Sequence, residues 1–147
     1  LRRDGGFTLV EMLIVVAIIA ILVAVSMPMI NNALEKTKHA TDEANERAAK
    51  AEMVIQYLAD DEAVVYNGTT AQAPGKLTTN QIYYYDAANG YLNTTAPTVT
   101  YGQHNSHKYL ALKVDANGLV SMEWDASTAD AIKNGNLCGN QASSSHS

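Results

Sequence analysis

The feature that most constrains this chain is a long apolar run near its start. From Met12 to Ile30 the sequence carries no formal charge, and nearly every residue is apolar. A helix needs about 20 apolar residues to cross the hydrocarbon core of a bilayer, and continuing the run back to Phe7 supplies that length. Glu11 then lies in or close to the hydrocarbon, where a carboxylate costs at least about 3 kcal/mol at the centre and less near a helix end. The run therefore predicts a membrane-spanning helix with one carboxylate that needs a specific role.

The positions of the cationic residues predict the orientation of this helix. Arg2 and Arg3 precede the run, and the next cation is Lys36. Because positive residues favour the cytoplasmic side, we expect the N-terminus inside the cell and the later residues outside. A secretory signal peptide ends in a small-residue site after its apolar core, whereas Gly5-Gly6 comes before the core. Cleavage after Gly6 would leave the hydrophobic helix attached; an ordinary signal peptide and an uncleaved signal anchor are the alternatives.

The residues around this site resemble a known family. Residues 5–11 read GGFTLVE and are followed by the apolar run. This pattern is similar to the processing site and N-terminal segment of type IV pilins and of their relatives, the pseudopilins of type II secretion and the competence pilins. The resemblance implies a leader at residues 1–6, cleavage between Gly6 and Phe7 by a prepilin peptidase, and methylation of the new amine of Phe7. It covers Gly5 to about Pro28 closely, and the later residues in architecture only.

After Pro28 the apolar pattern changes from continuous to amphipathic. Apolar and small residues recur at intervals of three and four, the spacing of one helical face, at Ile30, Leu34, Thr37, Thr41, Ala44, Ala48, Ala51, Ile55 and Leu58. We therefore predict one helix from about Phe7 to about Asp61, with a transmembrane and assembly half at residues 7–30 and an amphipathic half at residues 31–62. Because Ala44, Ala48 and Ala51 lie on the apolar face, we expect them to pack against the domain's own sheet.

Pro28 opposes regular helical geometry. It lacks a backbone donor and crowds the preceding turn, so the sequence predicts a kink or local unwinding there. The resemblance to pilins implies that this proline permits bending or melting of the helix when a fibre is built. A proline that is simply tolerated at the membrane boundary is the alternative.

The residues after the helix predict a globular sheet region at 63–140 and a disordered tail at 141–147. Turn-forming residues are typical of a loop from Tyr66 to Gln81. The patterns that follow predict strands and then a short helix or turn, in the order 81–86, 98–101, 108–114, 119–125 and 126–132. The fold class predicted is α+β and pilin-like, with a long N-terminal helix packed on a small antiparallel sheet.

The strongest strand signal is a hairpin near residue 115. Turn residues from Asp115 to Gly118 separate its two strands. Leu110, Leu112 and Val114 share one face of the first strand, and Val120, Met122 and Trp124 share one face of the second. We expect these two faces to join and to pack against the helix.

Composition and scattered polar residues argue against most other functions. The formal charge of −5 disfavours phosphate-backbone binding, so nucleic acid is not an expected partner. A single cysteine, Cys138, forms no intrachain disulfide and is expected to be a buried or idle thiol; many Gram-negative pilins, by contrast, close a C-terminal loop with a disulfide. His104 and His107 form a close pair without a nearby cysteine in the sequence. We therefore expect no metal, no cofactor and, without a nucleophile motif, no enzymatic activity.

Two weaker patterns lie in the predicted loops. Asn67-Gly68-Thr69 and Asn93-Thr94-Thr95 fit the N-glycosylation triplet, which also arises often by chance. Asp115, Asn117 and Gly118 resemble the start of a calcium loop, but no glutamate follows at the required distance, so a turn is expected.

The leading hypothesis is a structural subunit of a type IV pilus, with the segments from Phe7 to Ile30 bundled in the fibre core. Glu11 of one subunit is expected to pair with the methylated amine of Phe7 on a neighbour, which offsets the burial of the carboxylate and sets the axial register. The expected partners are further copies, prepilin peptidase and the pilus assembly platform. The expected location is the cytoplasmic membrane before assembly and an extracellular fibre afterwards, with adhesion, motility and DNA uptake all open as its task.

Two other functions remain as alternatives. The first is a pseudopilin or competence pilin of a secretion or DNA-uptake apparatus. The second belongs to another class and is a membrane-anchored binding domain that does not polymerise.

Overall fold

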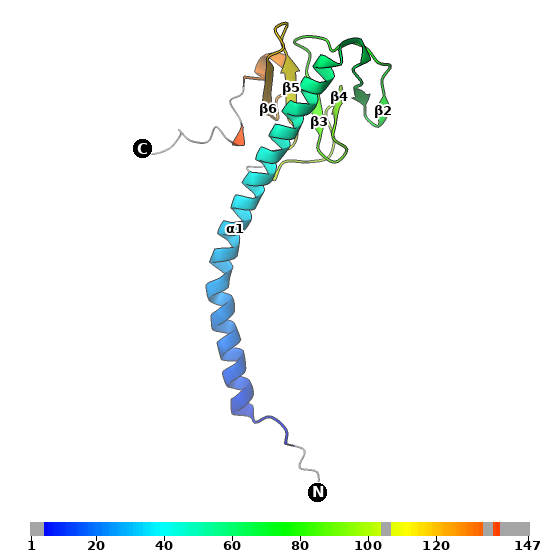
Figure 1. Cartoon of the computed structure of the whole chain (residues 1–147). Coiled ribbons are helices and arrows are strands. Elements are labelled where there is room, and N and C mark those ends of the chain that lie inside the picture. Colours follow the sequence, from blue (N-terminus) through cyan, green and yellow to red (C-terminus); the bar gives the residue numbers. More distant parts are fainter. Residues whose placement is uncertain (1–4, 104–106, 134–136, 139–147) are drawn as a thin grey trace, which may run out of the picture. The chain divides into compact units, whose positions relative to one another are not determined.

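The computed structural model describes residues 5–103, 107–133 and 137–138 (Figure 1). The chain divides into two compact units, residues 1–37 and residues 38–147. Residues 1–4 of the predicted leader at 1–6, and the predicted tail at 141–147, lie outside the described residues.

The dominant element is helix α1, which spans Leu9–Leu58 and contains 50 residues. It begins and ends close to the predicted limits of Phe7 and Asp61. α1 is helical at Pro28, without local unwinding there, and the expected kink stays a prediction. The helix ends where Asp60 takes a φ of +50°, a left-handed conformation that an α-helix does not continue. A short 3₁₀ turn, η1 at Asp60–Glu62, follows.

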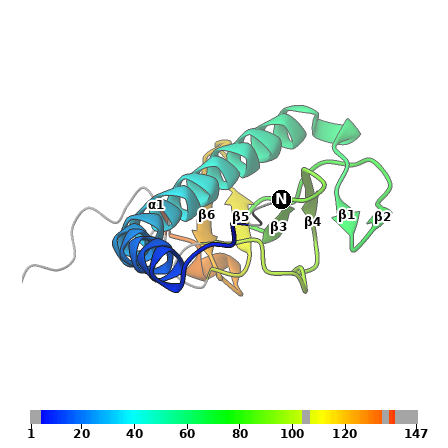
Figure 2. The ribbon, with the colours of Figure 1, turned by 90° about the horizontal axis from the view of Figure 1, so that it is seen from below.

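The second unit contains a six-stranded sheet in the order β2-β1-β4-β3-β5-β6. Figure 2 shows these strands side by side in this sequence. Neighbouring strands are antiparallel except for the parallel pair of β1 and β4. The strands are β1 at Tyr66–Asn67, β2 at Thr70–Ala71, β3 at Tyr83–Asp86, β4 at Tyr91–Asn93, β5 at Leu110–Val114 and β6 at Val120–Trp124. The predicted α+β class is therefore confirmed.

The hairpin predicted near residue 115 is confirmed in both register and turn. Leu110 pairs with Trp124, and Val114 pairs with Val120, which joins the two apolar faces as expected. Asp115 Oδ1 accepts hydrogen bonds from the backbone N–H of Asn117 at 2.8 Å and of Leu119 at 2.9 Å. Gly118 has a φ of +80°, which glycine adopts without the strain of a side chain. The Asp115 carboxylate thus closes the turn that the sequence predicted.

Other predicted elements differ from the structure. Residues 98–101 form no strand: Val99 is exposed, and Tyr101 donates an isolated backbone hydrogen bond to Lys108 O at 2.8 Å rather than joining a ladder. The segment predicted as a loop at 66–81 contains the short strands β1 and β2. β4 was not predicted because its three residues are too few to show alternation. By contrast, the predicted helix or turn at 126–132 is confirmed, because it contains the 3₁₀ turn η2 at Ala129–Ala131.

The main core joins one side of α1 to one face of the sheet. Ala49 and Met53 of α1 are completely buried there. The sheet contributes alternate residues of its strands, including Tyr83, Tyr85, Leu92, Leu110, Leu112, Val114, Val120, Met122 and Trp124. A smaller cluster of Tyr84, Ala111, Ala126 and Ile132 lies on the other sheet face. Burial of these tyrosines makes them packing residues of the subunit.

The predicted buried face of α1 is wrong. Ala44, Ala48 and Ala51 are exposed, and the buried residues are Asp42, Glu46, Ala49 and Met53. Each buried residue precedes a predicted one by two positions, which is about 200° around a helix. The packed face is therefore the opposite face. The periodicity favoured the wrong side because two of the buried residues are carboxylates, which a pattern of apolar residues assigns to solvent.

Candidate assembly segment and buried polar cluster

The start of α1 is closed by reciprocal hydrogen bonds between Thr8 and Glu11. The Thr8 backbone N–H donates to Glu11 Oε2 at 2.8 Å, and the Glu11 backbone N–H donates to Thr8 Oγ1 at 3.2 Å. This arrangement is a capping box, in which two helix-terminal donors find partners. A carboxylate in the first turn also interacts favourably with the helix dipole. Glu11 thus has a local role that the sequence interpretation missed, although Thr-x-x-Glu before an apolar run is its recognised pattern.

Gly6 and Phe7 precede the helix and are exposed. Neither residue belongs to a helix or strand, and Phe7 is 80% exposed. A backbone bond in an exposed, irregular segment is accessible to a peptidase. The predicted cleavage position is therefore accessible in the subunit.

The first unit exposes its apolar side chains on every side of α1. The large apolar residues from Leu9 to Leu34 are all at least 45% exposed. α1 is the helix, among the described residues, that is long and apolar enough to cross a membrane. Soluble monomers rarely expose an apolar surface of this extent, so the segment requires lipid or other protein around it.

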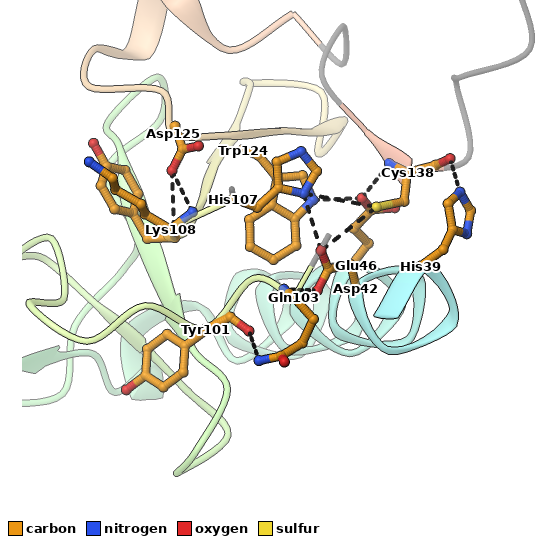
Figure 3. Close-up of polar contacts among 11 residues, drawn as sticks. His39, Asp42, Glu46, Tyr101, Gln103, His107, Lys108, Trp124, Asp125 and Cys138 are labelled. Carbon is orange, nitrogen blue, oxygen red and sulfur yellow. Dashed lines mark hydrogen bonds and ion pairs between the residues drawn. The ribbon is translucent and has the colours of Figure 1, made fainter. Parts of the chain in front are cut away.

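The second unit contains a cluster of buried polar residues next to Trp124 (Figure 3). His107 Nδ1 lies 3.2 Å from Asp42 Oδ2, and Cys138 Sγ lies 3.9 Å from each of these two atoms. Glu46 Oε1 accepts hydrogen bonds from Trp124 Nε1 at 2.7 Å and from the Cys138 backbone N–H at 2.8 Å. All five residues are at most 7% exposed. The cluster joins three distant parts of the chain through polar contacts in the core.

Three further contacts surround this cluster. The Gln103 backbone N–H donates to Asp42 Oδ1 at 2.7 Å. His39 Nε2 lies 2.7 Å from the Cys138 carbonyl oxygen, and the His107 ring stacks on Trp124 with centroids 4.7 Å apart. Figure 3 shows that α1 supplies one side of the cluster, while the opposing residues come from later segments. The sequence did not indicate this arrangement, because Asp42 and Cys138 are 96 residues apart.

The cluster lacks the geometry of a nucleophilic triad. In such a triad the acid orients one imidazole nitrogen while the other nitrogen takes the proton of the nucleophile. Here Asp42 and Cys138 both face Nδ1 of His107. Burial, followed by the nearby Glu46 and Asp42 carboxylates, raises the pKa of the Cys138 thiol to about 12. An activated thiol has a lowered pKa instead, so this group is held as a thiol rather than as a nucleophile.

A second polar network surrounds the buried carboxylate of Asp86. Its Oδ1 accepts hydrogen bonds from the Tyr101 hydroxyl at 2.8 Å and from the Ala88 and Asn89 backbone N–H groups at 3.0 and 3.1 Å. Burial by itself raises the pKa of Asp86, but the bonds from Asn89, Tyr101 and the backbone outweigh it, so the pKa is lowered. Burial first, and the bond to Asp86 second, raise the pKa of Tyr101 to about 12. The network fixes the turn between β3 and β4.

The two predicted glycosylation triplets, 67–69 and 93–95, are hydrogen-bonded to each other in the structure. Asn93 is buried; its Oδ1 accepts a hydrogen bond from the Gly68 N–H at 3.0 Å, and its Nδ2 donates to Gly68 O at 2.8 Å. The side chain that this triplet would offer for glycosylation is therefore engaged within the fold. Asn67 is exposed, and its Oδ1 accepts the Thr95 hydroxyl at 2.6 Å. His104 lies outside the described residues. The cysteine missing beside His107 in the sequence is supplied in space by Cys138.

Comparison with known proteins identifies relatives of this chain. A family model for the prokaryotic N-terminal methylation motif matches residues 1–27. Fimbrial protein EcpC of Eikenella corrodens is 30% identical over 144 residues, which cover 93% of this chain and 92% of that protein. No solved structure matches the chain. The motif, the exposed apolar helix and the near full-length similarity agree, and the chain belongs to the type IV pilin family.

Proposed function

We propose that this chain is the structural subunit of a type IV pilus, made in the membrane and polymerised into an extracellular fibre. A prepilin peptidase cleaves it between Gly6 and Phe7 and methylates the amine of Phe7. The assembly platform then transfers the subunit from the cytoplasmic membrane, where its N-terminus faces the cytoplasm, into the fibre. The fimbrial relative and the methylation motif support this proposal. It assigns the chain no catalytic residue and no nucleic-acid partner.

The observation that carries the proposal is the exposure of apolar side chains around α1 from Leu9 to Leu34. Lipid covers such a surface before assembly, and equivalent helices of other subunits cover it afterwards. Removing apolar surface from water contributes about 25 cal/mol per Å², so the segment is stable only when it is covered in one of these ways. The same surface therefore serves membrane retention and fibre formation in turn.

In this proposal Glu11 sets the register between subunits. The capping box and the helix dipole offset part of the cost of a carboxylate in an apolar environment. The methylated amine of Phe7 on a neighbour supplies the positive charge that a buried carboxylate requires. Loss of one member of a buried ion pair typically costs about 3 to 5 kcal/mol. An incorrect axial position leaves Glu11 without its partner, and this penalty selects the correct one.

The outward face of α1 in the second unit extends the contact between subunits. Ala44, Ala48, Ala51, Ile55 and Leu58 are exposed and recur at the spacing of one helical face. Their side chains face away from the core that Ala49 and Met53 form with the sheet. Small residues allow close approach of another helix, so a second copy of the subunit is the occupant that we propose for this face.

Pro28 provides a place where α1 bends or melts during assembly. A proline lacks the N–H that would bond the carbonyl of Ala24. The Ser26 hydroxyl donates to Leu22 O at 2.7 Å, a contact that is associated with helix bending. Two adjacent features therefore weaken regular helical hydrogen bonding in this turn.

The charge and cap functions of Glu11 are separable by mutation. Glutamine at this position preserves the capping box but removes the charge, whereas Thr8→Ala removes the cap and leaves the charge. We expect Glu11→Gln and Glu11→Ala both to insert in the membrane and to be cleaved but to form few fibres, and Thr8→Ala to form fibres. Electron microscopy of cells and immunoblotting of sheared filaments measure the outcome. Normal piliation by Glu11→Gln would reject the charge pairing.

The same preparations test the alternative functions. Short fibres confined to the cell envelope indicate a pseudopilin or competence pilin. An uncleaved chain that is monomeric in detergent indicates an anchored binding domain. Either result would replace the proposed function.

A further inference from the structure

We propose that Asp42, His107 and Cys138 form a zinc-binding site in the core of the second unit. Their three facing atoms are a carboxylate oxygen, an imidazole nitrogen and a sulfur, which are the three ligand types that zinc takes in proteins. All three residues are at most 2% exposed, so the site is isolated from solvent. This proposal concerns the stability of the subunit and does not depend on fibre formation.

The distances between the three atoms fit a zinc ion. Zinc bonds oxygen and nitrogen at about 2.0 to 2.2 Å and sulfur at about 2.3 Å, which places tetrahedral ligands about 3.3 to 3.8 Å apart. The observed separations are 3.2 Å for Asp42 Oδ2 to His107 Nδ1 and 3.9 Å from Cys138 Sγ to each of them. Shifts of a few tenths of an ångström would complete the three bonds. The ligand atoms therefore surround a point at bonding distance from all of them.

The charge of the cluster favours a bound cation. Asp42 and Glu46 place two carboxylates in a nearly solvent-free volume. Burying a carboxylate costs several kcal/mol unless positive charge and hydrogen-bond donors offset it. A divalent ion supplies this charge directly. As the sulfur–zinc bond forms, the thiol proton of Cys138 passes to the solvent, and the ion takes its place.

Neighbouring residues hold the proposed ligands in position. The Gln103 backbone N–H bonds Asp42 Oδ1 and leaves Oδ2 directed at His107. Glu46 bonds the backbone N–H of Cys138, which fixes the short segment that carries the sulfur. Such contacts orient metal ligands in proteins. A water molecule would fill the fourth position of a tetrahedral zinc, because Glu46 Oε1 already accepts two hydrogen bonds.

A metal at this position would link the segment of Cys138 to helix α1. Asp42 lies on α1, and Cys138 is 96 residues later in the chain. The unfolded chain does not hold these residues together and so does not bind the metal. The free energy of metal binding therefore adds to the stability of the fold. The proposed site is therefore a structural zinc site rather than a catalytic one.

The test measures zinc bound to the full chain purified in detergent. The protein is stripped with a chelator, equilibrated with zinc chloride and freed of excess ion, and its zinc is counted by mass spectrometry. We expect about one zinc per chain. We also expect a rise in melting temperature on adding zinc, and a thiolate-to-metal absorption band when cobalt(II) replaces zinc.

Matched variants assign the ligands. Cys138→Ala and Asp42→Asn should each weaken zinc binding by more than about 100-fold, which exceeds the usual effect of residues outside the metal's own ligands. Asp86→Asn, which alters another buried carboxylate of the same unit, should retain zinc. Circular dichroism establishes that each variant is folded. A folded wild-type chain without zinc, cobalt band or zinc-dependent melting temperature would show a hydrogen-bonded cluster only and overturn the proposal, as would equal zinc binding by Cys138→Ala.

Discussion

Helix α1 exposes apolar residues around its first part, whereas its second part buries carboxylates. From Leu9 to Leu34 every large apolar side chain is substantially exposed, and the one charged residue of the apolar run, Glu11, lies in the capping box. From Lys38 onward, Asp42 and Glu46 are buried in the second unit. One continuous helix thus exposes apolar side chains in its first part and buries charged side chains in its second part.

The difference shows what kind of partner each part requires. Among the described residues, none covers the apolar side chains of the first part, so this surface requires lipid or other protein around it. The second part packs against the sheet, and the segments of Gln103, His107 and Cys138 place polar groups against its buried carboxylates. Polar residues inside this unit are stable because specific donors meet them. The exposed face of α1 in this unit is the one that we propose contacts a second copy of the subunit.

The largest expected difference in the free energy of unfolding is between truncating a side chain on the buried face of α1 and truncating one on its exposed face in the second unit. Met53→Ala removes a completely buried side chain and should lower the free energy of unfolding by about 2 to 5 kcal/mol. Leu58→Ala removes an apolar side chain from the exposed face and should change it by less than about 0.5 kcal/mol. Urea denaturation of the monomer in detergent measures both. Equal losses in the two variants would contradict the assignment of the buried face.

Removing a buried carboxylate should have the next largest effect. Glu46→Ala leaves Trp124 Nε1 and the Cys138 backbone N–H without their acceptor and should cost about 1 to 3 kcal/mol. Glu43→Ala is its control, because Glu43 forms a surface ion pair with Arg47 that contributes at most about 1 kcal/mol. Thermal melts of the two variants compare buried and surface acids on the same helix. A Glu46 variant as stable as wild type would show that the buried acid is unimportant.

Removing the Tyr101 hydroxyl should have a smaller effect with a distinct pH dependence. Tyr101→Phe loses the bond to Asp86 and should cost about 1 kcal/mol at neutral pH. The pKa of Tyr101 is raised to about 12 from 10.0, so the folded state retains this proton more strongly than the unfolded state. The stabilisation is therefore complete below pH 10 and is lost as the pH rises toward 12. The variant should lack this alkaline loss in melts measured across that range.

Asp86 makes the stabilisation by the same network depend on pH in the acid range. Its pKa is lowered in the folded state, so its contribution is present above the ordinary aspartate pKa and is lost as the pH falls through the folded value. Asp86→Asn should therefore flatten the acid side of the stability profile. If the stability of this variant falls at low pH as it does in the wild type, Asp86 does not stabilise the fold through its charge.

The sequence predicted those features that depend on neighbouring residues. The apolar run defined the start of α1, and the Asp115 turn defined the β5–β6 hairpin and its register. The cap between Thr8 and Glu11 was also readable, since Thr-x-x-Glu is a local pattern, and Asn89-Gly90 is a turn signal that precedes the missed strand β4.

The predictions that failed concern features that depend on contacts between residues far apart in the sequence. No local pattern indicates that Asp42 and Glu46 lie inside, because their donors come from Gln103, Trp124 and Cys138. For the same reason the sequence showed His107 without a cysteine, although Cys138 lies beside it in the fold. Periodicity then assigned the helix face by hydrophobicity alone and selected the side that faces away from the sheet. The apolar residues on that side form the face that we propose contacts a second copy of the subunit.

The most direct test of the account is the chemical structure of the N-terminus in assembled filaments. Filaments sheared from cells that produce this chain are dissociated, and the subunit is analysed by intact and fragment mass spectrometry. The account predicts that the subunit begins at Phe7 and carries a methyl group on its amine. A filament subunit that still contains Gly6, or a chain found only uncleaved in the membrane, would contradict it.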